Sequence, residues 1–142
     1  HSNGGSLNNT YKDYEYMRCP QLDQAFTGLI DDLEDRGLLD ETVVAVLSEF
    51  GRTPKINGSG GRDHYPPAWS NFLCGGSIKG GQVIGSTDRI GAAPHDRPVT
   101  PPQVIASIYK GMGIDLETTM MPGPGSRPIR LIDAEPIPEL FS

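Results

Sequence analysis

The sequence predicts an α/β fold, and three patterns along the chain support this prediction. A one-sided apolar stripe spans residues 21–36, a nearly continuous apolar run spans 42–48, and a second one-sided stripe follows Thr100. Helices with one apolar face pack on sheets, and strands covered on both faces read as continuous apolar runs. A helix, a short turn and a buried strand form the second half of a β-α-β unit. We therefore expect the strand to lie inside a largely parallel sheet that the helix covers on one face.

The first helix is expected over residues 21–36. Residues 1–18 are expected to form a polar arm or loop, with a turn of helix near the tyrosines as an alternative. Gly37 is placed to end the first helix. Its apolar positions recur every three or four residues, which is the helical period. They are Leu22, Ala25, Phe26, Leu29, Ile30 and Leu33. A stripe of this kind is typical of a core-facing surface rather than a ligand site.

A second short strand is expected at residues 70–74, ended by Gly75 and Gly76. The glycine-rich segment 78–85 (I-K-G-G-Q-V-I-G) follows it. This segment lacks the G-x-x-x-x-G-K-[ST] order of a phosphate-binding loop, and no long helix follows to direct its N-terminus at an anion. We expect a hairpin or surface turn there.

The last helix is expected to open at Thr100. Thr100 is placed to cap it, Pro101 suits the first helical position, and Gln103 completes the spacing of a capping box. A short strand is expected at residues 129–132, followed by a turn and an extended tail that contains prolines. No internal repeat is present, so residues 1–142 form one domain or one portion of a larger domain.

Composition excludes several classes of function. The chain has 142 residues and a net charge of −6, and so lacks the basic surface that a nucleic-acid partner requires. No stretch reaches the roughly 18 apolar residues of a membrane span. The two cysteines, Cys19 and Cys74, form no C-x-x-C motif and indicate no zinc site. A disulfide between them has little support, and a small buried apolar role suits Cys74 better.

Candidate site residues gather where the apolar run 42–48 ends. Glu49 follows the run, a glycine-rich loop comes next, and Asp63-His64 closes the loop. Ligands of α/β proteins bind beyond the carboxyl ends of strands, and a carboxylate facing a histidine is a common metal-binding arrangement. Two alternatives stay open: Glu49 caps a helix or pairs with Arg52, and His64 is a solvated loop residue.

The strings E-F-G-R-T-P, G-G-R-D-H-Y-P-P-A-W-S, G-G-x-I-K-G-G-Q-V-I-G and D-R-P-V-T-P occur in order along the chain. From about Leu22 to Phe141 the sequence resembles a bacterial family of unassigned function within the alkaline phosphatase and sulfatase superfamily. The resemblance implies an alkaline-phosphatase-like three-layer sandwich. It also implies a longer protein, with this chain as its carboxyl-terminal part, and a periplasmic or extracellular location.

The resemblance further implies a metal site. Glu49 stands where the superfamily has a carboxylate ligand and His64 where it has a later histidine. Asp63 is either another ligand or the group that orients an imidazole, and we favour the second role because adjacent residues of an extended chain point apart. His1 is a further ligand candidate, as the remnant of an upstream D-T-H-x-x-N string. Phe50, however, occupies the position of an expected ligand histidine.

Zn, Mn or Ca suits this mixture of oxygen and nitrogen ligands. Arg52 and Arg62 flank the loop and are candidates to clamp a sulfate or phosphate group bidentately. Pairing of either arginine with Glu49 or with loop carbonyls is an equal alternative. His95 is expected to be structural or exposed.

No credible nucleophile is present, since Ser48 merely adjoins Glu49 and Cys74 lacks the sulfatase string C-x-[PA]-x-R. Two functions therefore compete. One is the carboxyl-terminal part of a metal-dependent hydrolase of sulfate or phosphate esters, carried by small molecules or glycans, which is inactive as an isolated chain. The other is a non-catalytic binding or structural module. In either case we expect the incomplete sheet to need a partner chain or a second copy.

Overall fold

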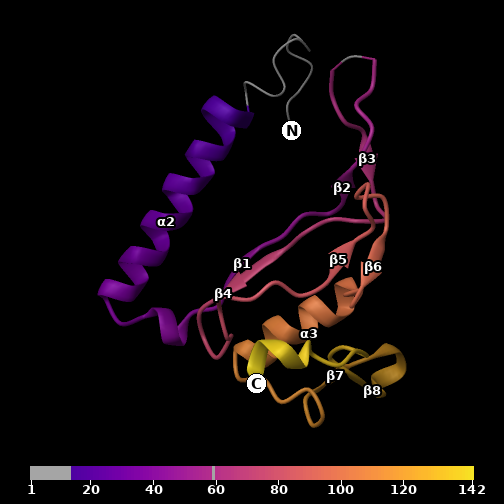
Figure 1. Cartoon of the computed structure of the whole chain (residues 1–142). Coiled ribbons are helices and arrows are strands. Elements are labelled where there is room, and N and C mark those ends of the chain that lie inside the picture. Colours follow the sequence, from indigo (N-terminus) through magenta and orange to yellow (C-terminus); the bar gives the residue numbers. More distant parts are fainter. Residues whose placement is uncertain (1–13, 59) are drawn as a thin grey trace.

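The structure is a computed structural model, which describes residues 14–58 and 60–142 (Figure 1). Short strands and turns separate its two α-helices in this part of the chain. The helical elements are η2 (Tyr14–Arg18), α2 (Cys19–Asp35), η3 (Leu39–Glu41), α3 (Pro101–Gly111), η4 (Pro124–Ser126) and η5 (Pro138–Phe141). The strands are β1 (Val44–Val46), β2 (Gly51–Arg52), β3 (His64–Tyr65), β4 (Phe72–Cys74), β5 (Ser86–Thr87), β6 (Pro94–Asp96), β7 (Met120–Pro122) and β8 (Pro128–Arg130).

Helix α2 forms where the apolar stripe predicts it and ends as expected at Gly37. This glycine adopts a positive φ of 66°, a conformation that costs glycine little because it has no Cβ. The backbone N–H of Gly37 donates to the carbonyl of Glu34 at 2.9 Å, and that of Leu38 donates to Leu33 at 2.8 Å. These bonds satisfy carbonyls at the end of the helix, as in a glycine-terminated helix.

The strand expected at 42–48 is present in a shorter form, as β1. It pairs with β4 in antiparallel register, with Val46 opposite Phe72. All strand pairs of the described residues are antiparallel and two-stranded: β1–β4, β2–β3, β5–β6 and β7–β8. No parallel pair is present among the described residues, so the largely parallel sheet and the three-layer sandwich stay predictions.

The burial of β1 differs from the expectation of a strand covered on both faces. Val44 is half-buried and Val46 is exposed. Side chains alternate between the two faces of a strand. Val43 and Leu73 pack on the core, whereas Val46 and Phe72 line the side that faces α2. Helix α2 lies to one side of the β1–β4 pair, and α3 and η5 lie to the other (Figure 1). Within residues 14–58 and 60–142, the second side is the better covered of the two.

The core lies between α3, the β1–β4 pair and the carboxyl-terminal turn. Its buried members are Ile78, Val104, Ile137 and Leu140. The expectation of an extended tail is wrong for residues 138–141, which form the 3₁₀-helix η5. Ile137 and Leu140 are three residues apart, and this spacing brings two side chains to the same side of a 3₁₀ turn. The tail is therefore part of the core.

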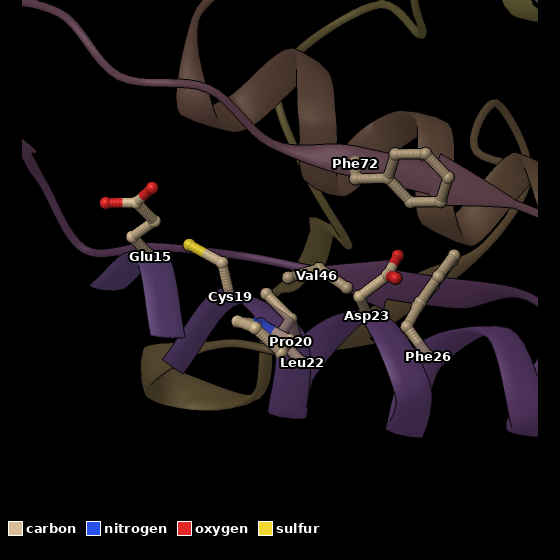
Figure 2. Close-up of a pocket in the computed structure, with 8 residues that line it drawn as sticks. All are labelled: Glu15, Cys19, Pro20, Leu22, Asp23, Phe26, Val46 and Phe72. Atoms are coloured by element: carbon tan, nitrogen blue, oxygen red, sulfur yellow. The ribbon is translucent and has the colours of Figure 1, made fainter. Parts of the chain in front are cut away.

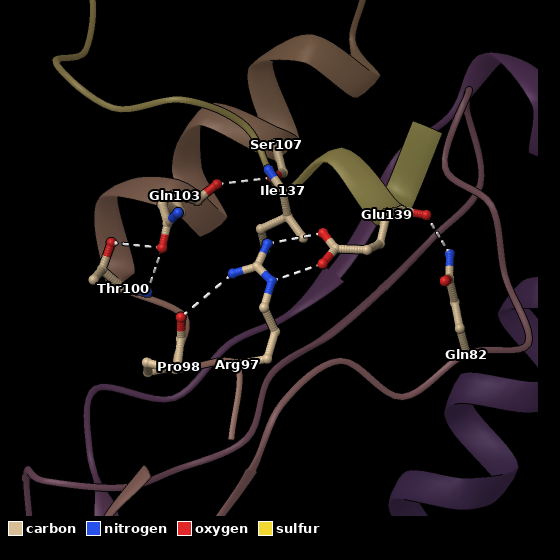
Figure 3. A network of polar contacts seen from close by, with 8 residues as sticks. All are labelled: Gln82, Arg97, Pro98, Thr100, Gln103, Ser107, Ile137 and Glu139. Atoms are coloured by element: carbon tan, nitrogen blue, oxygen red, sulfur yellow. Dashed lines mark hydrogen bonds and ion pairs between the residues drawn. The ribbon is translucent and has the colours of Figure 1, made fainter. Parts of the chain in front are cut away.

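A polar network fixes this tail to the rest of the fold (Figure 3). The Arg97 guanidinium donates from Nε and Nη2 to the two carboxylate oxygens of Glu139, at 2.6 and 2.8 Å. These bonds lower the pKa of Glu139 to about 2. Gln82 donates from Nε2 to the Glu139 carbonyl at 2.7 Å. The buried Ser107 hydroxyl accepts a bond from the backbone N–H of Ile137 at 2.8 Å. The network thus ties η5 both to α3 and to the loops before it.

Helix α3 begins as predicted after Thr100, whose backbone N–H donates to Gln103 Oε1 at 3.0 Å. The glycine-rich segment 78–85 is irregular, with a bend at Gly81 in place of the expected hairpin or turn. The backbone N–H of Lys79 donates to the carbonyl of Leu140 at 2.8 Å. This segment therefore supports the tail. The last predicted strand, at 129–132, appears as β8 at Pro128–Arg130, paired with β7.

Candidate functional site

The candidate site is the β2–β3 hairpin, which brings both ends of the glycine-rich loop together. Gly51 pairs with Tyr65, and Arg52 pairs with His64. Gly51 is required here because a Cβ at this position would lie only 1.8 Å from the carbonyl oxygen of Ala68. This close approach of two backbone segments lets the hairpin lie against the chain that follows it. Residues that are twelve positions apart in sequence become neighbours.

Hydrogen bonds across the loop hold its two arms in register. The backbone N–H of Thr53 donates to the Asp63 carbonyl at 3.0 Å, and the backbone N–H of Asp63 donates to Thr53 Oγ1 at 3.1 Å. Asn57 donates from Nδ2 to Asp63 Oδ1 at 2.8 Å and accepts a bond from the backbone N–H of Gly61 at 3.0 Å. The Asp63 carboxylate thus orders the loop through the Asn57 amide.

The two candidate arginines both lie on this hairpin. Arg52 donates from Nη1 to the Arg62 carbonyl at 3.3 Å, and Arg62 donates from Nη1 to the Thr53 carbonyl at 3.0 Å. These are the loop carbonyls that the alternative interpretation anticipated. Each contact uses one of the five N–H donors of a guanidinium, and both side chains are exposed. Donors therefore remain for an oxyanion from solution.

Phe50 packs against the candidate histidine. Its ring stacks on the His64 imidazole with centroids 4.0 Å apart and planes inclined by 29°. The Arg52 guanidinium carbon lies 5.8 Å from the centroid of the Phe50 ring, within the range of a cation–π contact. The three side chains therefore form one cluster on one face of the hairpin: an aromatic ring, an imidazole and a permanent positive charge.

The remaining candidates lie around this cluster or outside it. Glu49 is exposed and precedes β2. Next to it, Ser48 donates from Oγ to the Phe50 carbonyl at 2.7 Å. His95 is exposed on β6, in keeping with its expected role. His1 lies outside the described residues.

A complete metal site is not formed by the described residues. Across positions 14–58 and 60–142, no three His, Cys, Asp or Glu side chains are grouped so that they could share one metal ion. Glu49, Asp63 and His64 therefore do not fit a metal as a set on their own. Any metal held by Glu49 or His64 would need ligands from elsewhere.

The two cysteines form no disulfide with each other, and Cys74 is a poor candidate for a nucleophile. Both Cys19 and Cys74 are free thiols, so the weakly supported disulfide is absent. Burial raises the pKa of the Cys74 thiol. Since the thiolate is the reactive form, Cys74 is a poor nucleophile near neutral pH.

Sequence reasoning missed Thr53 and Asn57, which order the loop. Asn57 opens the string N-G-S-G-G, and asparagine beside glycine is a strong signal for a turn in which the side chain bonds the local backbone. That signal was available. The part played by Thr53 depends on the register of the hairpin, which the sequence does not display.

Comparison with known proteins gives the family of the chain. No curated protein and no solved structure matches it. No helix of the described residues is long and apolar enough to cross a bilayer.

Residues 8–141 match the family described as "Protein of unknown function (DUF1501)". The match spans nearly the whole chain and confirms the bacterial family of unknown function, whereas the superfamily relationship stays a prediction. The chain belongs to the DUF1501 family.

Proposed function

We propose that this chain is the carboxyl-terminal part of a metal-dependent hydrolase of sulfate or phosphate esters, and that its β2–β3 hairpin binds the oxyanion group of the ester. One observation carries the proposal: Arg52 and Arg62 are both exposed, and each donates a hydrogen bond to a backbone carbonyl of the same hairpin. Guanidinium groups are suited to sulfate and phosphate because they donate two parallel hydrogen bonds. The small-molecule or glycan part of the ester would lie outside this contact.

The two arginines would stabilise negative charge on the sulfate or phosphate group. An oxyanion gains or redistributes negative charge as the ester bond breaks, and fixed donors placed beforehand stabilise that charge. The hydrogen bonds among Thr53, Asn57 and Asp63 would contribute by keeping the loop in one arrangement. Ordering the loop in advance reduces the entropy lost on binding.

A divalent metal, Zn, Mn or Ca, belongs to the proposal through Glu49 and His64. Its other ligands would come from outside the described residues, with His1 as one candidate. Because the described residues do not complete a metal site, we derive no catalytic step through the metal. A nucleophile would likewise have to come from elsewhere, so we expect the isolated chain to be inactive. Export to the periplasm or the cell exterior is part of the same proposal.

A second candidate function is a non-catalytic module that binds oxyanions. The stacking of Phe50 on His64 favours it, because an aromatic ring there occupies the position of an expected metal ligand. This module would use the same arginines but no metal. The two functions therefore differ in metal content and turnover, not in anion binding.

Anion binding is tested first, by calorimetric titration of the chain with inorganic sulfate and phosphate. Arg52→Ala and Arg62→Ala should each weaken binding by about tenfold, the equivalent of one charge-assisted hydrogen bond. Arg89→Ala is the matched control, since Arg89 is exposed in the turn between β5 and β6. Equal affinity in all four proteins would show that the hairpin is not the anion site.

Metal content and turnover then separate the two functions. In the longer protein, Glu49→Gln and His64→Ala should lower bound metal, and His95→Ala should not. The longer protein should cleave an aryl sulfate or aryl phosphate when supplied with Zn²⁺, Mn²⁺ or Ca²⁺, and the isolated chain should not. Anion binding with neither metal nor turnover in the longer protein would establish the binding module and exclude the hydrolase.

A further inference from the structure

A groove of about 590 Å³ lies between helix α2 and the β1–β4 pair (Figure 2). Its apolar wall is formed by Leu22 and Phe26 from the helix and by Val46 and Phe72 from the strands. Two carboxylates, Glu15 and Asp23, also line it. None of these residues belongs to the β2–β3 hairpin, so the groove is separate from the proposed ester site.

The groove exposes apolar surface that a folded protein ordinarily covers. Leu22 is 57% exposed and Phe72 is 48% exposed. Helix α2 buries none of its seventeen residues. Helices in proteins are stabilised mainly by packing of their apolar face, and extended apolar patches mark interaction surfaces. The edge-to-face contact between Phe26 and Phe72, with centroids 4.8 Å apart, joins the two walls. The remaining apolar surface is available to another polypeptide.

The charges of the groove restrict what can cover it. Glu15 and Asp23 are eight residues apart, so they lie on the same side of the continuous helical segment formed by η2 and α2. Figure 2 shows Asp23 on the same face of the helix as Phe26. Among the described residues, the lining contains no positively charged side chain. Both carboxylates are exposed, and positive side chains of an occupant placed beside them would be attracted to them.

These constraints select one kind of occupant. Apolar side chains would pack on the wall formed by Leu22, Phe26, Val46 and Phe72, and lysine or arginine would complement the charges of Glu15 and Asp23. A second copy of the chain suits the groove poorly, because a symmetric pairing of grooves would bring acidic residues together and each chain carries a net charge of −6. A membrane surface rich in anionic lipid is disfavoured for the same reason.

We infer that this groove binds an amphipathic, basic segment of a partner protein. The apolar face of the segment packs between α2 and the β1–β4 pair, and its cationic side chains pair with Glu15 and Asp23. This arrangement is recognition of an amphipathic segment by an apolar groove, in which spaced apolar anchors give affinity. The charge pairs add specificity for basic over acidic segments.

The test uses fluorescence anisotropy of the whole chain with two labelled peptides. Both are amphipathic and about 14 residues long, a common helix length, with leucine on one face. One carries lysine on the other face and its matched counterpart carries glutamate. The lysine peptide should bind at least tenfold more tightly than the glutamate peptide, and the difference should shrink as salt screens the charges.

Variants of the chain then locate the binding. Asp23→Lys should weaken binding of the lysine peptide about tenfold. Asp133→Lys changes the net charge equally at an exposed position outside the groove, and should leave affinity unchanged. Leu22→Asp should also weaken binding without unfolding the chain, because Leu22 is already exposed.

Three results would overturn the inference. One is equal binding of the two peptides. Another is an equal effect of Asp23→Lys and Asp133→Lys, which would reduce the interaction to net charge. The third is a dimer in sedimentation equilibrium that Leu22→Asp dissociates, which would make a second copy the occupant of the groove.

Discussion

Replacing Ser107 with alanine tests the packing of the carboxyl-terminal turn on α3. Ser107 is fully buried, and its hydroxyl forms two hydrogen bonds of 2.8 Å. It donates one to the carbonyl of Gln103 and accepts the other from the backbone N–H of Ile137. Alanine would leave the N–H of Ile137, a residue only 4% exposed, without this partner. A buried donor that loses its partner costs about 1–3 kcal/mol.

We therefore expect Ser107→Ala to lower the free energy of unfolding by about 1–3 kcal/mol. For a chain of this size, that loss corresponds to a fall in Tm of roughly 3–12 °C. Urea denaturation followed by circular dichroism gives the free energy directly. Ser77→Ala is the matched control, because Ser77 is exposed and its replacement should change stability by less than about 0.5 kcal/mol. A loss below 0.5 kcal/mol for Ser107→Ala would refute the reasoning, since the Ile137 N–H would then have found another acceptor.

Three further predictions concern the tail, helix α2 and turnover. The folded-state pKa of Glu139, about 2, lies below its ordinary value of 4.5. Its contribution should be complete above pH 4.5 and lost as pH falls toward 2, so the Tm difference between the wild type and Glu139→Gln should shrink over that interval. A constant difference would contradict this. Phe26→Ala should cost about 1–2 kcal/mol, less than the roughly 3–5 kcal/mol of a core phenylalanine, because Phe26 is half-buried. A double-mutant cycle with Phe72→Ala should give a coupling of about 0.5–1.5 kcal/mol. The purified chain should show no turnover of aryl sulfate or aryl phosphate with added Zn²⁺, Mn²⁺ or Ca²⁺, and turnover that His64→Ala abolishes would show that the chemistry is contained here.

The sequence predicted the elements whose signals are local. The stripe from Leu22 to Leu33 located α2, Gly37 located its end, and Thr100 with Gln103 located the start of α3. Each of these signals depends on residues within a few positions of one another, because helical spacing and capping are properties of one or two turns. Residues 70–74 were likewise recognised as a strand and appear as β4.

Pairing and packing between distant segments could not be predicted in the same way. The register of β1 with β4 joins Val46 to Phe72 across a long loop, and nothing in either strand specifies the direction of its neighbour. The tail illustrates the same limit. Ile137 and Leu140 read as part of an extended segment, because their burial depends on contacts with α3 that only the folded chain displays.

The candidate site shows where such limits matter for function. Glycine content and the positions of Arg52, Arg62 and His64 were enough to locate the loop. The partners of these residues were not foreseeable, because the hairpin sets Arg52 opposite His64 and brings Phe50 onto the imidazole. The contact between Phe50 and His64 favours the non-catalytic binding module over the metal-dependent hydrolase. The His64 imidazole stacks on Phe50 with centroids 4.0 Å apart, which is an aromatic contact rather than a contact with Glu49. Oxyanion binding by Arg52 and Arg62 requires neither a change in that stack nor a metal, and is therefore the part of the proposal that the geometry supports most directly.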